Sequence, residues 1–102
     1  MAPEVLDRTA IDTALEALPG WTYDGEALVR RADVPGDTQD SLERTVAQAA
    51  DELDHHPQVQ RAAEAMTFRL WTHSAGGVTA KDVDLAARID QVLSGAGPDR
   101  QA

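Results

Sequence analysis

The chain has three histidines, and all three stand where predicted elements end. His55 and His56 close a predicted helix, and His73 closes a predicted strand. Imidazole titrates near neutral pH and can both donate and accept a proton within one turnover. Asp51 precedes His55 by four residues, one helical turn, where its carboxylate could hold the imidazole in one tautomer. The spacing therefore indicates general acid–base chemistry without a metal, with Asp51 orienting His55.

Other interpretations of these histidines stay open. Taken singly, a histidine at a helix end is more often a surface residue whose cation interacts with the helix dipole, and His73 could be an ordinary strand-edge residue. Three imidazoles and a water could hold a catalytic zinc ion, but adjacent histidines without a partner four residues away fit that site poorly. A Ser–His–Asp system lacks its elbow motif, and the Gly76-Gly77 loop lacks the lysine of a phosphate-binding loop.

Two further residues have both a structural and a functional interpretation. Asp82 lies three residues after Thr79, the spacing of a helix-capping pair, so capping is favoured over catalysis. Trp21 begins a predicted strand, where its indole could stack on a flat ligand or fill the core. Exposure of the Trp21 ring to solvent would favour the ligand.

The composition bounds the class of protein. The chain has 102 residues, 42% of them hydrophobic, which predicts a single domain over 1–102, ordered from about residue 8 to 95 and frayed from Ala96. No cysteine is present, which excludes disulfide frameworks and thiol catalysis and predicts the cytoplasm as the compartment. Nine basic and eighteen acidic residues give a net charge of −9, which disfavours nucleic acid and anionic membranes as partners. The N-terminus lacks the apolar run of a signal peptide or membrane span.

Hydrophobic periodicity and turn signals divide the chain into seven elements. Apolar residues at helical spacing predict helices, alternating ones predict strands, and Asp24-Gly25 suits a hairpin turn. The predicted elements are a helix over 9–18 capped by Thr9, strands over 21–23 and 27–34, a helix from Asp37 or Thr38 to about Asp54, strands over 58–62 and on to Thr72, and a helix capped by Thr79 that ends at Gly95. In isolation, residues 61–65 also fit a helix. The order α-β-β-α-β-β-α predicts an α+β fold, a four-stranded antiparallel sheet with three helices on one face.

Alternation along the last predicted strand divides its side chains between two faces. Phe68 and Leu70 are expected to pack beneath the helices. Arg69, Trp71 and His73 then project from the other face, where His73 is accessible to solvent.

Residues 51–57 (DELDHHP), residues 71–79 (WTHSAGGVT) and Asp82 together resemble the signature of the pterin-4a-carbinolamine dehydratase family. The eighteen residues from His55 to His73 and the nine from His73 to Asp82 match the spacing in that family. The predicted order of elements is also that of the family's fold. The likeness extends to Gly20-Trp21 and Leu85-Ala86.

The resemblance implies a lyase that dehydrates 4a-hydroxytetrahydropterin to quinonoid dihydropterin, a step in tetrahydrobiopterin recycling, without a metal or other cofactor. The 4a-hydroxyl must be protonated to leave while N5 loses a proton, and imidazoles can do both at neutral pH. By position, the resemblance assigns acid–base catalysis to His55, His56 and His73, with Asp51 as the orienting acid. The candidate pterin-binding residues are Asp54, Thr72, Ser74 and Trp71 through its backbone, with Trp21 as a further candidate.

Three positions depart from the family pattern. Val59 and Ala63 stand where aromatic residues are common, which predicts fewer aromatic side chains near the pterin or within the core, and Asp51 stands where the longer glutamate is common. Some members of the family also act as a dimerisation cofactor for a transcription factor, so an interaction module without required catalysis is the second hypothesis. A small homo-oligomeric structural protein is the third. The uncovered sheet face and the strand edges predict a homodimer or homotetramer.

Overall fold

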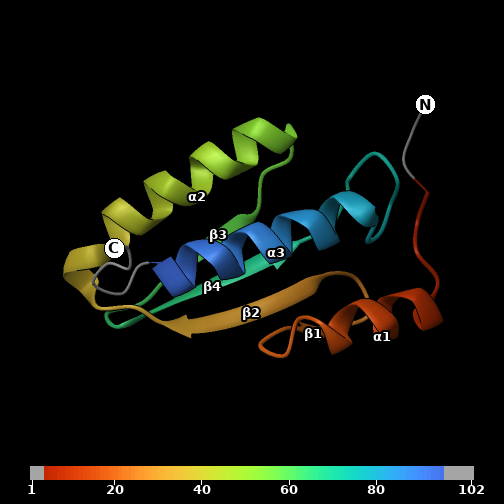
Figure 1. Cartoon of the computed structure of the whole chain (residues 1–102), viewed down its shortest axis with the longest axis horizontal. Helices are drawn as coiled ribbons and strands as arrows, with labels where there is room; N and C mark the ends of the chain where they lie inside the picture. The colour runs from red at the N-terminus through yellow and green to blue at the C-terminus, as the bar shows by residue number, and fades with distance from the viewer. Residues whose placement is uncertain (1–3, 96–102) are drawn as a thin grey trace.

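The structure is a computed structural model that describes residues 4–95, so the tail expected to fray from Ala96 lies outside the described residues. The predicted order of helices and strands is confirmed, and element boundaries agree with the prediction to within two residues. The elements are α1 (Arg8–Glu16), β1 (Thr22–Tyr23), β2 (Leu28–Asp33), the 3₁₀ turn η1 (Gly36–Thr38), α2 (Gln39–Leu53), β3 (Gln58–Arg61), β4 (Ala65–Leu70) and α3 (Ala80–Gly95) (Figure 1).

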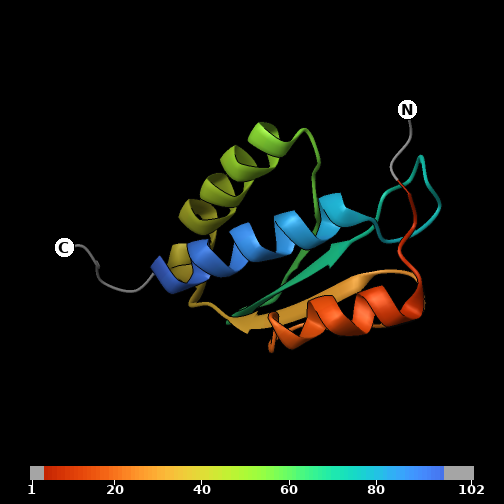
Figure 2. The ribbon, with the colours of Figure 1, turned by 45° about the vertical axis from the view of Figure 1, so that its right-hand side comes forward.

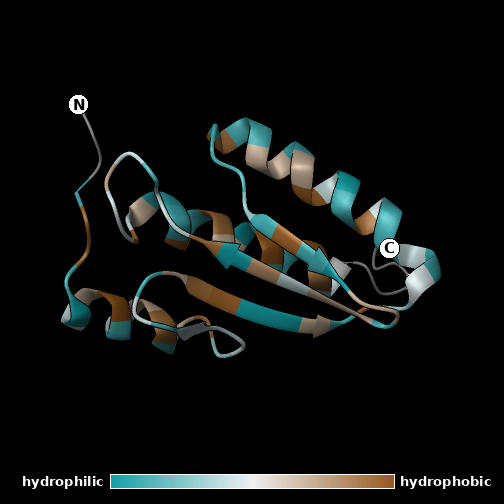
Figure 3. Cartoon of the chain, turned by 180° about the vertical axis from the view of Figure 1, so that it is seen from behind, coloured by the Kyte–Doolittle hydropathy of each residue, from teal (hydrophilic) through white to brown (hydrophobic). Residues whose placement is uncertain are grey.

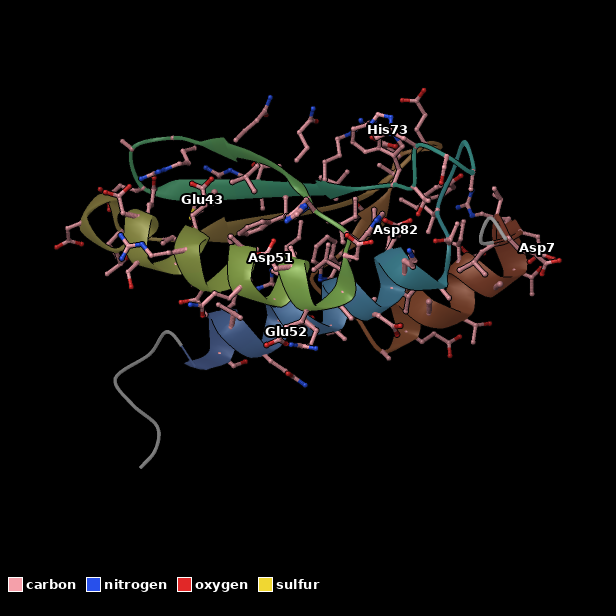
Figure 4. All side chains as sticks on the ribbon, turned by 90° about the horizontal axis from the view of Figure 1, so that it is seen from above. Asp7, Glu43, Asp51, Glu52, His73 and Asp82 are labelled. Carbon is pink, nitrogen blue, oxygen red and sulfur yellow. The ribbon has the colours of Figure 1, made fainter. Side chains whose placement is uncertain are left out.

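The four strands form one antiparallel sheet in the order β1-β2-β4-β3. The central strands β2 and β4 pair from Leu28 opposite Leu70 to Asp33 opposite Ala65. Because β3 and β4 form a hairpin, residue 61 lies in a strand and the helix considered over 61–65 is excluded. The three helices lie on one side of the sheet, as the views in Figures 2 and 4 show, so the predicted α+β fold is confirmed.

The core fills the space between the sheet and the helices. In β4 the alternate residues Met66, Phe68 and Leu70 are fully buried, as the strand periodicity predicted, and in β2 Leu28 and Ala32 are buried on either side of the half-buried Arg30. Burial of each large apolar side chain stabilises the fold by about 1.5–3 kcal/mol. Figure 3 shows the opposite, open face, where polar and apolar segments alternate along the strands. The large buried side chains include Ile11, Leu28, Val46, Met66, Phe68, Leu70, Leu85 and Ile89.

Two helix caps differ from the prediction. Asp7, rather than Thr9, caps α1, because its carboxylate accepts the N–H of Ala10 at 2.8 Å, and Thr9 lies inside the helix. Thr38 occupies the position before α2, but its hydroxyl donates to the carbonyl of Pro35 and its side chain does not cap the helix. The hydroxyl of Thr38 thus forms a local bond to the backbone before α2 instead of accepting an amide of the helix.

Asp24 closes the turn between β1 and β2. Its Oδ1 accepts the amides of Ala27 and Glu26 at 2.8 and 2.9 Å, and its Oδ2 accepts the guanidinium of Arg69. These bonds, the two backbone amides first, hold the pKa of Asp24 below its ordinary value of 3.8. Gly25, next in the turn, has a φ of 98°, which favours glycine.

We expect Asp24→Ala to lower the free energy of unfolding by about 1 kcal/mol at neutral pH, mainly because two turn amides lose their acceptor. A carboxylate with a depressed folded pKa stabilises the protein above its unfolded pKa, and this contribution is lost as pH falls through the folded pKa. The difference between wild type and variant should therefore shrink below pH 3.8. Urea unfolding of both proteins at neutral and at acidic pH measures it. A difference that stays constant with pH would contradict this account.

Candidate active site

Helix α2 ends in a turn that presents His55 and His56. Asp54 follows the helix with a left-handed φ of 53°, and the amide of His55 donates to the carbonyl of Ala50 at 3.0 Å. This is the hydrogen-bond pattern of a Schellman turn. Pro57 then biases the backbone of His56 away from helical geometry. The chain therefore reverses at Asp54 and leaves both imidazoles at the end of the helix, as predicted.

A second turn, after β4, brings His73 and Ser74 to the surface. Thr72 and Gly77 form an antiparallel bridge in which the amide of Thr72 donates to the carbonyl of Gly77 at 2.9 Å. Gly76 closes the turn with a φ of 78°, a conformation that favours glycine. His73 and Ser74 lie within this turn and are exposed.

Asp82, in the first turn of α3, is fully buried and connects these two turns. Its Oδ2 accepts the amide of Thr79 at 2.9 Å and the hydroxyl of Thr72 at 2.8 Å. Its Oδ1 lies 2.5 Å from Nε2 of His55. One carboxylate therefore joins the end of α2, the segment after β4 and the start of α3.

The contacts of Asp82 define the tautomer of His55. An ionised carboxylate can only accept hydrogen bonds, so Nε2 of His55 carries a proton, and Nδ1 is the nitrogen that can exchange a proton with a substrate. The His55 side chain is 12% exposed and that of Asp82 is 0% exposed, so water screens this pair little. The geometry is that of an imidazole held in one orientation for proton transfer.

Asp51 does not orient His55, which corrects the sequence prediction. Its Oδ1 lies 2.8 Å from Nε2 of His56 instead, and this pair is exposed, 73% for Asp51 and 60% for His56. The spacing of four residues aligns two side chains only while a helix continues. Because Asp54 ends the helix in a left-handed conformation, His55 turns towards α3 and His56 towards Asp51.

His73 lies on the open face of the sheet, as predicted. Figure 4 shows it above the sheet at the same end as Asp82, which lies on the side of the helices. Thr72, the residue before His73, donates to Asp82 and so ties this segment to His55. Within residues 4–95, no hydrogen bond joins His73 to the other two histidines. The structure thus places the three histidines at one end of the sheet without direct contact.

The predicted pterin-binding residues divide into exposed and buried ones. Asp54 and Ser74 are exposed, and Trp71 is half-buried. Thr72 is buried, and its hydroxyl is bonded to Asp82 and Thr79. The side chain of Thr72 therefore holds the carboxylate in place, whereas Asp54 and Ser74 are free to meet a ligand.

Trp21 is a core residue, and its interpretation as a ligand-stacking residue is wrong. Its exposed fraction is 3%, and its Nε1 donates to Oδ1 of Asp90 at 2.9 Å. Arg30 donates to the same oxygen at 3.2 Å. Asp90 lies two helical turns beyond Asp82 along α3, about 12 Å away along the helix axis. The indole therefore fills the core away from the histidines.

Ala63 does not border the candidate site. It is exposed in the turn between β3 and β4, at the opposite end of β4 from Thr72. The expectation that Ala63 removes an aromatic side chain from the neighbourhood of the histidines is therefore wrong. Val59, the other departure, is half-buried in β3 and packs against the core.

The contact between Asp82 and His55 is the feature that sequence reasoning missed. The predicted capping role is confirmed, because the carboxylate of Asp82 accepts the backbone amide of Thr79. The hydroxyl of Thr79 in turn accepts the backbone amide of Lys81. The imidazole that shares Asp82 lies 27 residues away in sequence, beyond the reach of local spacing rules. The available signal was the position of Asp82 within the family signature.

Neither a metal centre nor a membrane-spanning helix occurs in the described part of the chain. Among residues 4–95, no three histidine, aspartate or glutamate side chains are arranged to hold a metal ion. Over the same range, no helix combines the length and the apolar character that crossing a membrane requires.

Comparison with known proteins bears on the whole of this architecture. The family described as pterin 4 alpha carbinolamine dehydratase matches residues 4–92, which include all the residues of the candidate site. A protein of Mycolicibacterium smegmatis is 44% identical over 92 residues (88% of this chain, 97% of that one), and one of Nocardia farcinica is 40% identical over 93 residues (90% and 98%). Both are provisionally named pterin-4-alpha-carbinolamine dehydratases.

Among solved structures, the crystal structure of a transcriptional coactivator/pterin dehydratase from Brucella melitensis has a TM-score of 0.82 and 33% sequence identity. The alignment covers 87% of this chain and 98% of that one. The sequence match spans both histidine segments and Asp82, and the likeness in fold spans the elements that position them. The chain therefore belongs to the pterin 4 alpha carbinolamine dehydratase family.

Proposed function

We propose that the protein is a hydro-lyase that dehydrates 4a-hydroxytetrahydropterin to quinonoid dihydropterin, as in tetrahydrobiopterin recycling. The observation that carries the proposal is the pair formed by His55 and Asp82, an imidazole held by a buried carboxylate and little exposed to water. The membership of the chain in the dehydratase family supports the choice of substrate. The absence of cysteine from the sequence is in keeping with the cytoplasm as the compartment.

The reaction needs two proton transfers and no net change in protons. The bond between C4a and the hydroxyl oxygen breaks as that oxygen takes a proton and leaves as water, and N5 loses a proton as the double bond between C4a and N5 forms. An imidazolium can give the first proton and a neutral imidazole can take the second. In the proposal His55, His56 and His73 share these roles, Asp82 orients His55, and Asp51 orients His56.

The proposed pterin-binding groups are the exposed side chains of Asp54 and Ser74 and the backbone of Trp71. Thr72 acts through Asp82 rather than by touching the substrate. The direct test is the rate at which the purified protein dehydrates chemically prepared carbinolamine. A rate no higher than that of the buffer-catalysed reaction would contradict the proposal.

A second candidate function is that of an interaction module for a transcription factor. It is favoured by the likeness to the Brucella melitensis protein, whose name joins a transcriptional coactivator with a pterin dehydratase. A stable hetero-complex that persists in the double variant His55→Gln/His73→Ala would support this function. Histidine-dependent turnover would support the enzyme.

We also expect the protein to form a homodimer or homotetramer. One face of the sheet is uncovered, and the edge strands β1 and β3 each have an unpaired side within the described chain. Unpaired strand edges and an open face are surfaces that a small chain protects by association. Sedimentation velocity at micromolar concentration should show at least a dimer. A strict monomer at the highest concentration reached would contradict this expectation.

A further inference from the structure

Three side chains on the open face of the sheet form a stack that ends at His73. Arg69, Trp71 and His73 alternate along the end of β4 and the segment after it, so they project from the same face. The guanidinium carbon of Arg69 lies 5.0 Å from the centre of the Trp71 ring. The rings of Trp71 and His73 are 4.6 Å apart, with their planes inclined by 53°. The indole thus lies between a cation and the imidazole.

The Arg69 end of the stack is fixed by two carboxylates. Its guanidinium donates to Oδ2 of Asp24 at 2.9 and 3.2 Å and to Glu26 at 3.0 Å. Both acceptors belong to the turn between β1 and β2, and β2 is the direct neighbour of β4 in the sheet. Arg69 therefore has little freedom to move away from the face of the indole. The cation–π contact in turn holds the ring of Trp71 in place.

The His73 end has a different environment from that of the other histidines. His55 and His56 are each held by a carboxylate, whereas no group within residues 4–95 forms a hydrogen bond with the ring of His73. Its imidazole packs instead against the indole of Trp71, and such packing restricts the rotation of a ring. A group that transfers protons must be held close to its productive geometry, and a displacement of about 1 Å can lower the rate by about 10²-fold.

We propose that Trp71 is a positioning residue that holds the imidazole of His73 for proton transfer, an inference that rests on the proposed dehydratase function. The indole is not a free surface for a flat ligand, because Arg69 and His73 flank it on either side along the strand. Its side chain therefore acts on the reaction through His73, and loss of the ring changes kcat more than KM.

The test compares Trp71→Ala and Trp71→Phe with wild type. We expect Trp71→Ala to lower kcat about 10- to 100-fold with KM changed less than about threefold, and Trp71→Phe to restore most of the loss. Thr67→Ala is the matched control, because Thr67 lies on the same face of β4 without contact to His73, and it should keep wild-type kcat. The ring-proton NMR shifts of His73 give a readout besides activity, since the ring current of a neighbouring indole displaces them.

Each outcome bears on the inference. A shift of the His73 resonances in Trp71→Ala, partly restored in Trp71→Phe, together with the loss of kcat supports it. Wild-type kcat in Trp71→Ala, an equal loss in Trp71→Phe, or a rise in KM at constant kcat overturns it while the dehydratase function stands. A wild type without activity overturns the proposed function, and His73 resonances that do not move in Trp71→Ala then overturn the contact itself.

Discussion

Replacing His55 by glutamine is expected to lower kcat for carbinolamine dehydration by about 10²–10⁴-fold, the contribution of a general acid or base. Glutamine has an amide nitrogen near the position of Nε2, so it can still donate to the buried carboxylate of Asp82. It cannot exchange a proton as Nδ1 of the imidazole can. The variant therefore separates proton transfer from the structural role of the side chain.

The folding of this variant provides its control. Because the hydrogen bond to Asp82 is retained, we expect the midpoint of urea unfolding to stay close to that of wild type. His55→Ala, in contrast, removes the donor and should lose both activity and stability. A His55→Gln protein with the wild-type kcat would contradict the assignment of His55 to catalysis.

The other histidines extend the same test. His73→Ala and His56→Ala remove exposed side chains, so their effect on stability should stay within about ±0.5 kcal/mol. We expect each to lower kcat by about tenfold or more, because the proposed mechanism assigns proton transfer to all three imidazoles. The measurement is kcat/KM as a function of pH for wild type and the variants, with circular dichroism to show that each is folded. If the His55, His56 and His73 variants all kept rates near that of wild type, the result would favour the function as an interaction module.

The fold was predictable from the sequence because its signals are local and repeated. Helical spacing of apolar residues, strict alternation from Met66 to Leu70 and the Asp24-Gly25 turn each concern residues near one another in the chain, and each agrees with the structure. The prediction chose the wrong cap for α1 because Asp7 and Thr9, two residues apart, both have side-chain oxygens that can accept a backbone amide at the start of a helix. The choice between them depends on the path of the chain before the helix.

The candidate site was predictable in its residues but not in its pairings. The three histidines do stand at element ends, and the tertiary structure places those ends together. Which carboxylate meets which imidazole depends on the turn at Asp54, whose left-handed backbone redirects His55 from Asp51 to Asp82. Rules based on helical spacing cannot predict these pairings, because the helix has already ended at that turn. The choice between the two interpretations of Trp21 likewise depended on tertiary structure, since its buried indole donates to Asp90, 69 residues away in α3.

Asp82 is the residue for which stability and catalysis should separate most clearly. Asp82→Ala removes the acceptor of the Thr79 amide, the Thr72 hydroxyl and His55 at once. Loss of a helix cap costs about 0.5–2 kcal/mol, and a buried donor left without a partner costs about 1–3 kcal/mol. We therefore expect Asp82→Ala to lower the free energy of unfolding by about 2–4 kcal/mol. Asp7→Ala is the matched control, because Asp7 caps α1 at an exposed end of the molecule that Figure 4 shows apart from Asp82.

Asp82→Asn changes the chemistry with less change in shape. Its amide oxygen can still accept from Thr79 or Thr72, but its amide nitrogen would donate to His55 and favour the tautomer with the proton on Nδ1. A wrong tautomer in a comparable aspartate–histidine pair lowers kcat by about 10⁴-fold, so we expect a loss of about 10²-fold or more for Asp82→Asn. Urea unfolding, kcat and the nitrogen NMR shifts of His55 measure the three effects separately. If Asp82→Asn kept the wild-type kcat, and Asp82→Ala lost no more stability than Asp7→Ala, Asp82 would be a helix cap alone and His55 would need another orienting group.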